Sequence, residues 1–337
     1  MKKRLTFLAI VLFTCALPAF SLSLLGFGTD FHTFAQQLGD EMLPDLRSAA
    51  VSGMGLESAG SFPFPHISVA LSAGSVLSSG LFSFVDKNPS PFSLLDFNAL
   101  ANAALSGSST LQNLYSGMKS FFPYPVTRIG IGLGSIAGFD TQLQFAIWPE
   151  GFTDAIMSAA KVSGLKFSTF DAGFRLRRIL IPEQSVTPGL SVSFGYVLSD
   201  FYLNYNLGSA GTVDMNGTNF TFSGSLVAES IIHSLGADFM VYKKLGIVRL
   251  YGGLGLWEQI NYYKAGVESF NVTDTGGDNY QTQGGSDPIL QQTLSVMTML
   301  VLGGVDFKFG GFALFIHGQF DPVAGVPTAN LGLGFGF

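Results

Sequence analysis

The stretch that decides the fold is NLGLGFGF, residues 330–337, in which large apolar residues and glycines alternate after Asn330. A period of two is typical of a β-strand, whose successive side chains point to opposite faces. One face of this strand is therefore apolar and the other is almost bare. Because an exposed strand of this kind would make a soluble protein aggregate, we expect lipid to cover the apolar face.

The composition favours a membrane protein that lacks membrane-spanning helices. Of the 337 residues, 47% are hydrophobic and only 12% are charged, whereas soluble domains are about 25% charged. Beyond residue 25, no stretch approaches the roughly 20 unbroken apolar residues that a spanning helix needs. A closed β-barrel is the other fold that satisfies every backbone group in lipid, so the composition predicts a transmembrane barrel.

The first residues have the pattern of a secretory signal peptide. Basic residues at 2–4 precede an apolar run at 5–17, and small residues lead to Ser21, after which we expect cleavage. The alternative is a retained anchor at residues 7–25, although Pro18 and Ser21 interrupt it. The only cysteine of the chain lies in this segment, so we expect no disulfide and no thiol chemistry in the mature protein.

Apolar alternations recur along the rest of the chain and predict an all-β fold, an antiparallel barrel of about ten strands. Nine of the predicted strands lie beyond residue 125, and the tenth opens the barrel. The predicted strands span residues 66–85, 127–134, 139–147, 164–178, 189–205, 226–243, 247–263, 293–309, 312–320 and 328–337. With an even number of strands, both ends of the barrel sequence lie at the same side.

The connections between these strands alternate strictly between longer and shorter. The longer ones are residues 86–125, 149–163, 206–225, 264–292 and 321–327, and the shorter ones are 138, 179–188, 244–246 and 310–311. Outer-membrane barrels keep short turns in the periplasm and long loops outside. We therefore expect Lys243 and Lys244 at a periplasmic turn, and Asp274, Asp278 and Asp287 outside.

Two segments show helical spacing instead of strand alternation: residues 22–65 and residues 86–120. The predicted organisation is a signal peptide at 1–21, a helical leader at 22–65 and a barrel at 66–337, with 86–120 as a helical loop insertion. We expect Pro44 to interrupt the leader helix. The preferred interpretation is that these helices pack on the mouth of the barrel, and the alternative is a plug or gate in the lumen.

When the apolar face of each strand is assigned to lipid, a set of charged residues of mixed sign turns inward. This predicted lumen lining comprises Arg128, Asp140, Asp171, Arg175, Arg177, Asp238, Arg249, Asp306, Lys308 and His317. Facing lipid at the bilayer centre would cost an arginine or lysine about 2–4 kcal/mol. We favour a salt-bridged interior that fills a narrow lumen, with a selectivity lining as the alternative. In the strand at 164–178, Leu165 and Phe167 are out of phase with Phe170, so a bulge could displace the inward assignment there.

The sequence shows no constellation typical of catalysis or of metal binding. Four histidines, at 32, 66, 233 and 317, lie far apart without the spacing of a metal site. Removal of the three basic residues of the signal takes the formal net charge from −6 to −9, which argues against nucleic acid as a partner. We expect no enzymatic activity, no metal and no cofactor.

The C-terminal residues resemble the recognition signal of bacterial outer-membrane barrels, in which a polar residue is followed by glycine and by terminal aromatic residues. The matching residues are Asn330, Gly332, Phe335 and Phe337. The resemblance implies an outer-membrane protein of a diderm bacterium, surrounded by outer-membrane lipid and inserted by the barrel assembly machinery.

The overall layout, with FPFPHISVAL at residues 62–71 opening the first strand, is similar to that of poorly characterised outer-membrane barrels of the domain-of-unknown-function type. A looser similarity is to channels of the fatty-acid-transport type, which also carry N-terminal helices. The chain departs from those channels in having fewer predicted strands and in lacking their Asn-Pro-rich leader motif. No functional residues can therefore be carried over from them.

The expected function is the passage of small or hydrophobic molecules through a narrow, gated lumen. Ten strands lie near the size at which side chains fill a barrel, which excludes a wide porin. Phenylalanines of the helical segments could form an apolar site for hydrophobic ligands: Phe31, Phe34, Phe62, Phe64, Phe121 and Phe122. The alternative is a closed barrel that serves structure or surface display, such as adhesion.

Overall fold

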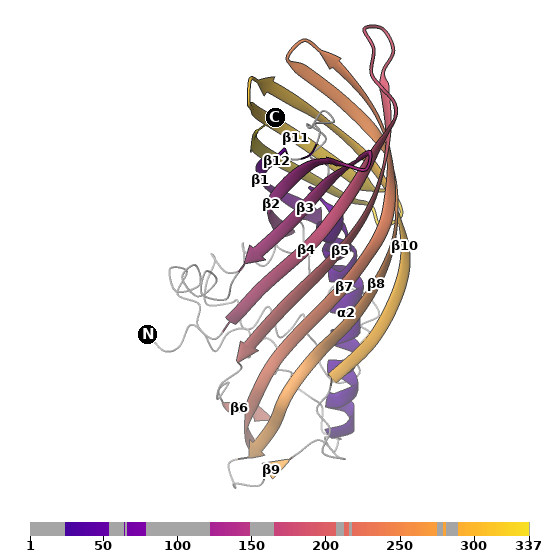
Figure 1. Cartoon of the computed structure of the whole chain (residues 1–337). Helices are drawn as coiled ribbons and strands as arrows, with labels where there is room; N and C mark the ends of the chain where they lie inside the picture. Colours follow the sequence, from indigo (N-terminus) through magenta and orange to yellow (C-terminus); the bar gives the residue numbers. More distant parts are fainter. Residues whose placement is uncertain are drawn as a thin grey trace.

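The computed structural model describes residues 24–53, 64, 66–78, 122–148, 165–206, 212–215, 218–274, 279–280 and 289–336. Within these residues, ten strands form a closed antiparallel barrel with one N-terminal helix (Figure 1). The prediction of an all-β barrel of about ten strands is confirmed. The predicted helical insertion at residues 86–120 lies outside the described residues.

The barrel strands follow one another around the wall almost in chain order. They are β1 (Ser68–Ser78), β2 (Phe122–Ile136), β3 (Phe139–Trp148), β4 (Leu165–Ile181), β5 (Gly189–Asn206), β7 (Thr218–Leu245), β8 (Val248–Asp274), β10 (Ile289–Phe309), β11 (Phe312–Asp321) and β12 (Val326–Phe335). Short strands β6 (Thr212–Met215) and β9 (Asn279–Tyr280) extend two hairpins. Pairing of β1 with β12 and of β7 with β8 closes the ring.

The wall of the barrel is much taller on one side than on the other. Strands β7 and β8 contain 28 and 27 residues, whereas β11 and β12 contain 10 each. Because a membrane-spanning strand needs about 9–11 residues, β7 and β8 continue well beyond the lipid. The sequence underestimated both strands, since the residues of their extensions do not keep the lipid-facing alternation.

Several short turns lie at one end of the barrel, which we call the short-turn end. Between β2 and β3, Ala137 and Gly138 both have positive φ (53° and 82°), as in the tight turns that match the twist of paired strands. The turn between β4 and β5 is tied to the end of β7, because Lys243 Nζ donates to the carbonyl oxygens of Gln184 (2.6 Å) and Ser185 (3.0 Å).

The lengths of the connections do not alternate strictly, in contrast to the prediction. The connection between β11 and β12, residues 322–325, is shorter than the β4–β5 turn at 182–188. Asp321 accounts for this compactness, because its Oδ1 accepts from the backbone N–H groups of Val323 (2.9 Å) and Ala324 (3.0 Å). A side-chain cap of this kind closes a hairpin without a long loop.

We predict that the short-turn end faces the periplasm. An epitope inserted after Gly246, between β7 and β8, should be hidden from antibody on intact cells and become accessible when the outer membrane is permeabilised. An epitope near Gly277, outside the described residues, should be labelled on intact cells. Labelling of the Gly246 insertion alone on intact cells would reverse the orientation.

Helix α2 (Leu24–Val51) continues through Pro44, so the predicted interruption is wrong. A proline inside a helix removes one backbone hydrogen bond. Here its neighbours Leu43 and Asp45 are buried, and packing against the barrel wall holds the helix together. The helix ends at Val51, and Gly53 just beyond it has a φ of 67°, the left-handed conformation that commonly follows the end of a helix.

The C-terminal half of α2 lies inside the barrel, and its N-terminal half follows the inner face of the tall wall (Figure 1). Ala35 and Leu46 pack with Ile232 of β7 and Tyr263 of β8. Further toward the short-turn end, Val51 packs in a second cluster with residues of β5, β7, β8 and β10. The preferred interpretation that this helix lies on the mouth of the barrel is therefore wrong.

No helix among the described residues is long and apolar enough to cross a membrane.

The position of α2 also explains the phase of Phe167 without a bulge. The pairing of β4 with β5 runs without a shift from Leu165 to Ile179. Phe167 points inward, where its ring meets the ring of Phe201 at a centroid distance of 5.5 Å. The predicted bulge near Phe167 is wrong because the inner face of the barrel is itself apolar where α2 packs.

The C-terminal strand shows why glycine alternates with large apolar residues. Leu331, Leu333 and Phe335 are 54%, 41% and 53% exposed on the outer face. On the inner face, a Cβ atom at Gly332 would overlap the ring of Phe315. Glycine is thus required where an aromatic side chain of the neighbouring strand crosses the same space. Phe337 lies outside the described residues.

Candidate functional site: the plugged lumen

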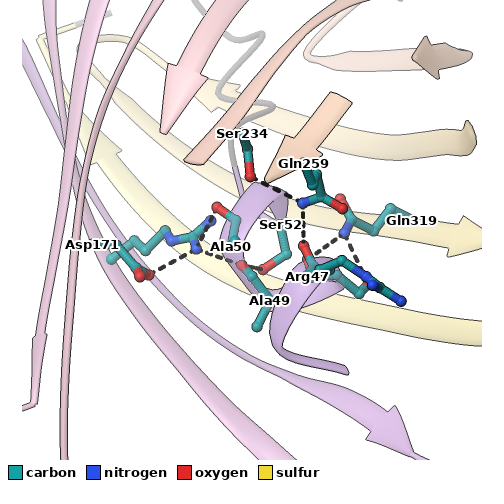
Figure 2. A network of polar contacts seen from close by, with 10 residues as sticks. Arg47, Ala49, Ala50, Ser52, Asp171, Ser234, Gln259 and Gln319 are labelled. Atoms are coloured by element: carbon teal, nitrogen blue, oxygen red, sulfur yellow. Dashed lines mark hydrogen bonds and ion pairs between the residues drawn. The ribbon is translucent and has the colours of Figure 1, made fainter. Parts of the chain in front are cut away.

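Amide side chains from two strands hold the C-terminal half of α2 by its backbone. Gln259 Nε2 on β8 donates to the carbonyl oxygen of Arg47 (3.0 Å) and to Ser234 Oγ (3.0 Å). Gln319 Nε2 on β11 donates to the carbonyl oxygen of Ser48 (2.8 Å). Figure 2 shows these bonds converging on the helix. A carbonyl has two lone pairs, so the helix accepts them without losing its own hydrogen bonds.

Two further contacts fix the height and rotation of α2. The hydroxyl of Tyr263 donates to the carbonyl oxygen of Ala35 (3.1 Å). The hydroxyl oxygens of Ser48 and Thr328 lie 2.9 Å apart and share a hydrogen bond. The helix is therefore tied to β8, β11 and β12 at points spread over much of its length.

Arg128 holds the C-terminal end of the helix. Its Nη2 atom donates to the carbonyl oxygens of Ala49 and Ala50 in the last turn of the helix, where the Ala49 carbonyl also accepts from the backbone N–H (3.1 Å) and the Oγ (2.9 Å) of Ser52. The same nitrogen forms an ion pair with Asp171 at 2.9 Å (Figure 2). A cation at this position also complements the negative end of the helix dipole. Arg128 thus joins α2 to strands β2 and β4.

Two ion pairs lie nearer the short-turn end, beyond the helix. Arg175 pairs with Asp238, which also accepts a hydrogen bond from Trp257 Nε1 at 2.9 Å. Arg177 donates to Asp140 Oδ2 from Nη2 (2.7 Å) and Nε (3.2 Å). These charges neutralise one another within a crowded interior. As placed, these four side chains fill space in the lumen.

The other four residues of the predicted lining lie near the same end, on β8, β10 and β11: Arg249, Asp306, Lys308 and His317. Asp306 and His317 are buried, and Arg249 and Lys308 are partly buried. The ring of His317 stacks on Tyr251 at a centroid distance of 5.9 Å, and the guanidinium of Arg249 lies 5.5 Å from the ring centre of Tyr242. Their role as the lining of a passage stays a prediction.

The residues of the predicted assembly signal divide between the two faces of β12. Asn330 is only 2% exposed and fills the space that Gly74 of β1 leaves free. Gly332 also points inward, whereas Phe335 faces outward. Recognition of these residues by the assembly machinery stays a prediction.

A small pocket lies between α2 and the wall formed by β2, β3, β4, β5 and β7. Leu46 lines it from the helix, and Phe167 and Phe201 line it from the wall, together with Asp171 and Ser199. Its free volume is about 20 Å³, enough for one or two water molecules. A larger molecule does not fit into the pocket as it stands.

Sequence reasoning missed the uncharged side chains that bind α2. Gln259, Gln319 and Tyr263 are buried polar residues on inward positions of their strands. A glutamine on the inner face of a membrane strand is a signal of buried hydrogen bonding. This signal was present in the sequence, but nothing in the alternation indicates that the partner is a helix.

The histidines do not come together in the described part of the chain. His66 contacts the carbonyl oxygen of Gly336, and His233 Nδ1 lies 2.7 Å from the hydroxyl of Tyr196. Among the described residues, no group of three or more His, Cys, Asp or Glu side chains could hold a metal ion.

The outer face of the barrel decides its environment. Every one of the ten barrel strands exposes a large apolar side chain: Leu71, Ile129, Ile147, Phe174, Phe194, Leu235, Leu254, Val301, Ile316 and Leu331. Soluble proteins rarely expose an apolar surface of this extent. The fold is that of an outer-membrane β-barrel. Lipid therefore covers the apolar outer face of the barrel, as the alternation in residues 330–337 predicts.

No protein-family model matches the chain, and no curated protein matches it. The fold is similar to that of the translocator domain of the autotransporter NalP from Neisseria meningitidis, with 10% identity, coverage of 92% of this chain and 99% of that chain, and a TM-score of 0.37. It is also similar to the outer-membrane protease OmpT from Escherichia coli, with 9% identity, 83% and 99% coverage and a TM-score of 0.38.

A homologue of FadL from Pseudomonas aeruginosa matches at 8% identity, with 96% of this chain and 100% of that chain covered and a TM-score of 0.27. At such identities and TM-scores, none of these neighbours says what this chain does.

Proposed function

We propose that this chain is an outer-membrane protein of a diderm bacterium that passes small or hydrophobic molecules through a narrow lumen, with α2 as its gate. The observation that carries the proposal is the way α2 is held. Gln259, Gln319 and Tyr263 each donate one hydrogen bond to its backbone, and Arg128 donates two. Because each such bond contributes only about 0.5–1.5 kcal/mol, the helix can be released in steps.

The preference for small or hydrophobic molecules follows from the surroundings of the helix. Phe201 and Ile232 form an apolar inner wall beside Ala35 and Leu46 of α2. When α2 moves, this wall becomes the surface that a passing molecule meets. A ten-stranded barrel offers little width, so we expect bulky solutes to be excluded.

A closed barrel for structure or surface display is the second candidate, and the ion pairs favour it. Arg175 with Asp238 and Arg177 with Asp140 occupy the lumen beyond the helix. If these pairs never separate, displacement of α2 opens no path through the lumen. Neither candidate assigns an enzymatic activity to the chain.

A reversible covalent lock tests whether α2 is the gate. Ser48 and Thr328 share a hydrogen bond at 2.9 Å between helix and wall, and the chain has a single cysteine, Cys15, within the predicted signal peptide. Replacing both residues by cysteine should allow a disulfide to form. In liposomes, we expect the oxidised protein to lose conductance and uptake of an apolar dye, and a reductant to restore both.

The Ser48→Cys single variant is the matched control and should respond to neither oxidant nor reductant. Equal passage through oxidised and reduced double variants would show that α2 is not the gate. If the wild type and the reduced double variant pass neither ions nor dye, transport is wrong and the closed barrel stands.

A further inference from the structure

The pocket beside α2 has a polar end and an apolar end. Asp171 on β4 and Ser199 on β5 are direct partners in the strand register, and both line the pocket. Phe167 and Phe201 line it nearer the end of the barrel opposite the short-turn end, because Phe167 lies near the start of β4 and Phe201 near the end of β5. A molecule that enters from the end opposite the short-turn end therefore meets the two aromatic rings before it reaches Asp171 and Ser199.

Ser199 is a buried polar residue of this pocket whose side chain lacks a partner. Its side chain is buried, and its Oγ atom forms no hydrogen bond with any described residue. A buried hydroxyl without a partner is costly, so a molecule that offers one would be bound there. Asp171 beside it forms an ion pair with Arg128 at 2.9 Å and adds a carboxylate to the same end of the pocket.

We propose that this pocket binds a small amphiphile whose polar head is a hydroxyl or an ammonium group and whose short apolar body lies between Phe167 and Phe201. The head donates to Asp171 and exchanges a hydrogen bond with Ser199. A carboxylate head is disfavoured because it approaches Asp171, and Arg128 is not among the residues that line the pocket. This inference rests on the proposed function, in which the pocket enlarges when α2 moves.

Three probes with the same alkyl chain test the preference for the head group: hexylamine, 1-hexanol and hexanoate. Trp148 lines the pocket, whereas the other tryptophan, Trp257, lies in a separate cluster. Binding to the protein in lipid nanodiscs is measured as a change in fluorescence, with Trp148→Phe as the control for signal from elsewhere. We expect the amine and the alcohol to bind about tenfold more tightly than the carboxylate.

Two substitutions assign the head-group contacts. Ser199→Ala should weaken binding of 1-hexanol by about two- to tenfold. Ser191→Ala is the matched control, since Ser191 is a buried serine of the same strand, also without a hydrogen bond to any described residue, but outside the pocket. Asp171→Asn should abolish the preference for hexylamine over hexanoate.

Equal affinities for the three probes, or tightest binding of hexanoate, would overturn the inference. It would also fall if Ser191→Ala weakened binding as much as Ser199→Ala. Passage through liposomes tests the proposed function separately. Selective binding without passage would support the binding pocket and contradict the gate. Passage without selective binding would support the gate and contradict the binding pocket.

Discussion

Replacing Asp238 by alanine is expected to destabilise the barrel by about 3–5 kcal/mol, the cost of leaving one partner of a buried ion pair unpaired. Asp238 and Arg175 are both almost fully buried. Alanine would leave the guanidinium without its counter-charge and remove the acceptor of Trp257 Nε1. The measurement is the free energy of unfolding in urea in lipid or detergent, followed by tryptophan fluorescence and by heat-modifiable migration on gels.

The matched control removes both charges and keeps the hydrogen bond. In the double variant Arg175→Met with Asp238→Asn, the asparagine still accepts from Trp257 and no buried charge remains. We expect this variant to recover most of the lost stability, because a neutral replacement of a buried pair is often close to neutral. If Asp238→Ala is as stable as the wild type, the pair does not hold the interior together.

The alternation of residues along each strand predicted the architecture because lipid imposes one simple rule on the outer face. Leu331, Leu333 and Phe335 face outward as the pattern requires. The rule weakens inside the barrel, where the environment changes with height. Phe167 is apolar and points inward, because it packs there against the hydrophobic cluster that includes residues of α2.

The partners of the inward side chains could not be predicted from alternation. A period of two says on which face Arg128 lies, but not that it binds the carbonyl oxygens of Ala49 and Ala50. That contact depends on how far α2 enters the lumen. The entire set of helix contacts, including Gln259 and Gln319, depends on the same tertiary placement.

Pro44 shows a different limit of the sequence. Local propensity predicts a break, since proline disfavours the interior of a helix. In the structure, contacts of its buried neighbours with the barrel outweigh that local cost. Local rules were most reliable where the surroundings were uniform, as on the lipid face, and least reliable where helix and wall meet.

Gly332 connects the opening stretch of sequence with the packing of the lumen, and its replacement by alanine is expected to cost about 1–3 kcal/mol of stability through overpacking. The new Cβ atom would overlap the ring of Phe315 and lie 2.6 Å from the carbonyl oxygen of Leu71. Gly318→Ala is the control, since its Cβ atom would meet nothing closer than 3.7 Å. That variant should unfold like the wild type.

A Phe315→Leu variant distinguishes a packing role of Gly332 from a role in recognition by the assembly machinery. If Gly332 serves packing, part of the cost of alanine disappears in a Phe315→Leu protein, because the ring that it overlaps is gone. The coupling energy between the two sites should then be about 1 kcal/mol or more, as for other residues in contact. If Gly332 serves only as part of the recognition signal, Gly332→Ala lowers membrane yield equally in both backgrounds and leaves the unfolding energy of the assembled protein unchanged. Unchanged stability in both backgrounds would therefore refute the packing role, whereas a smaller loss in the Phe315→Leu protein would support it.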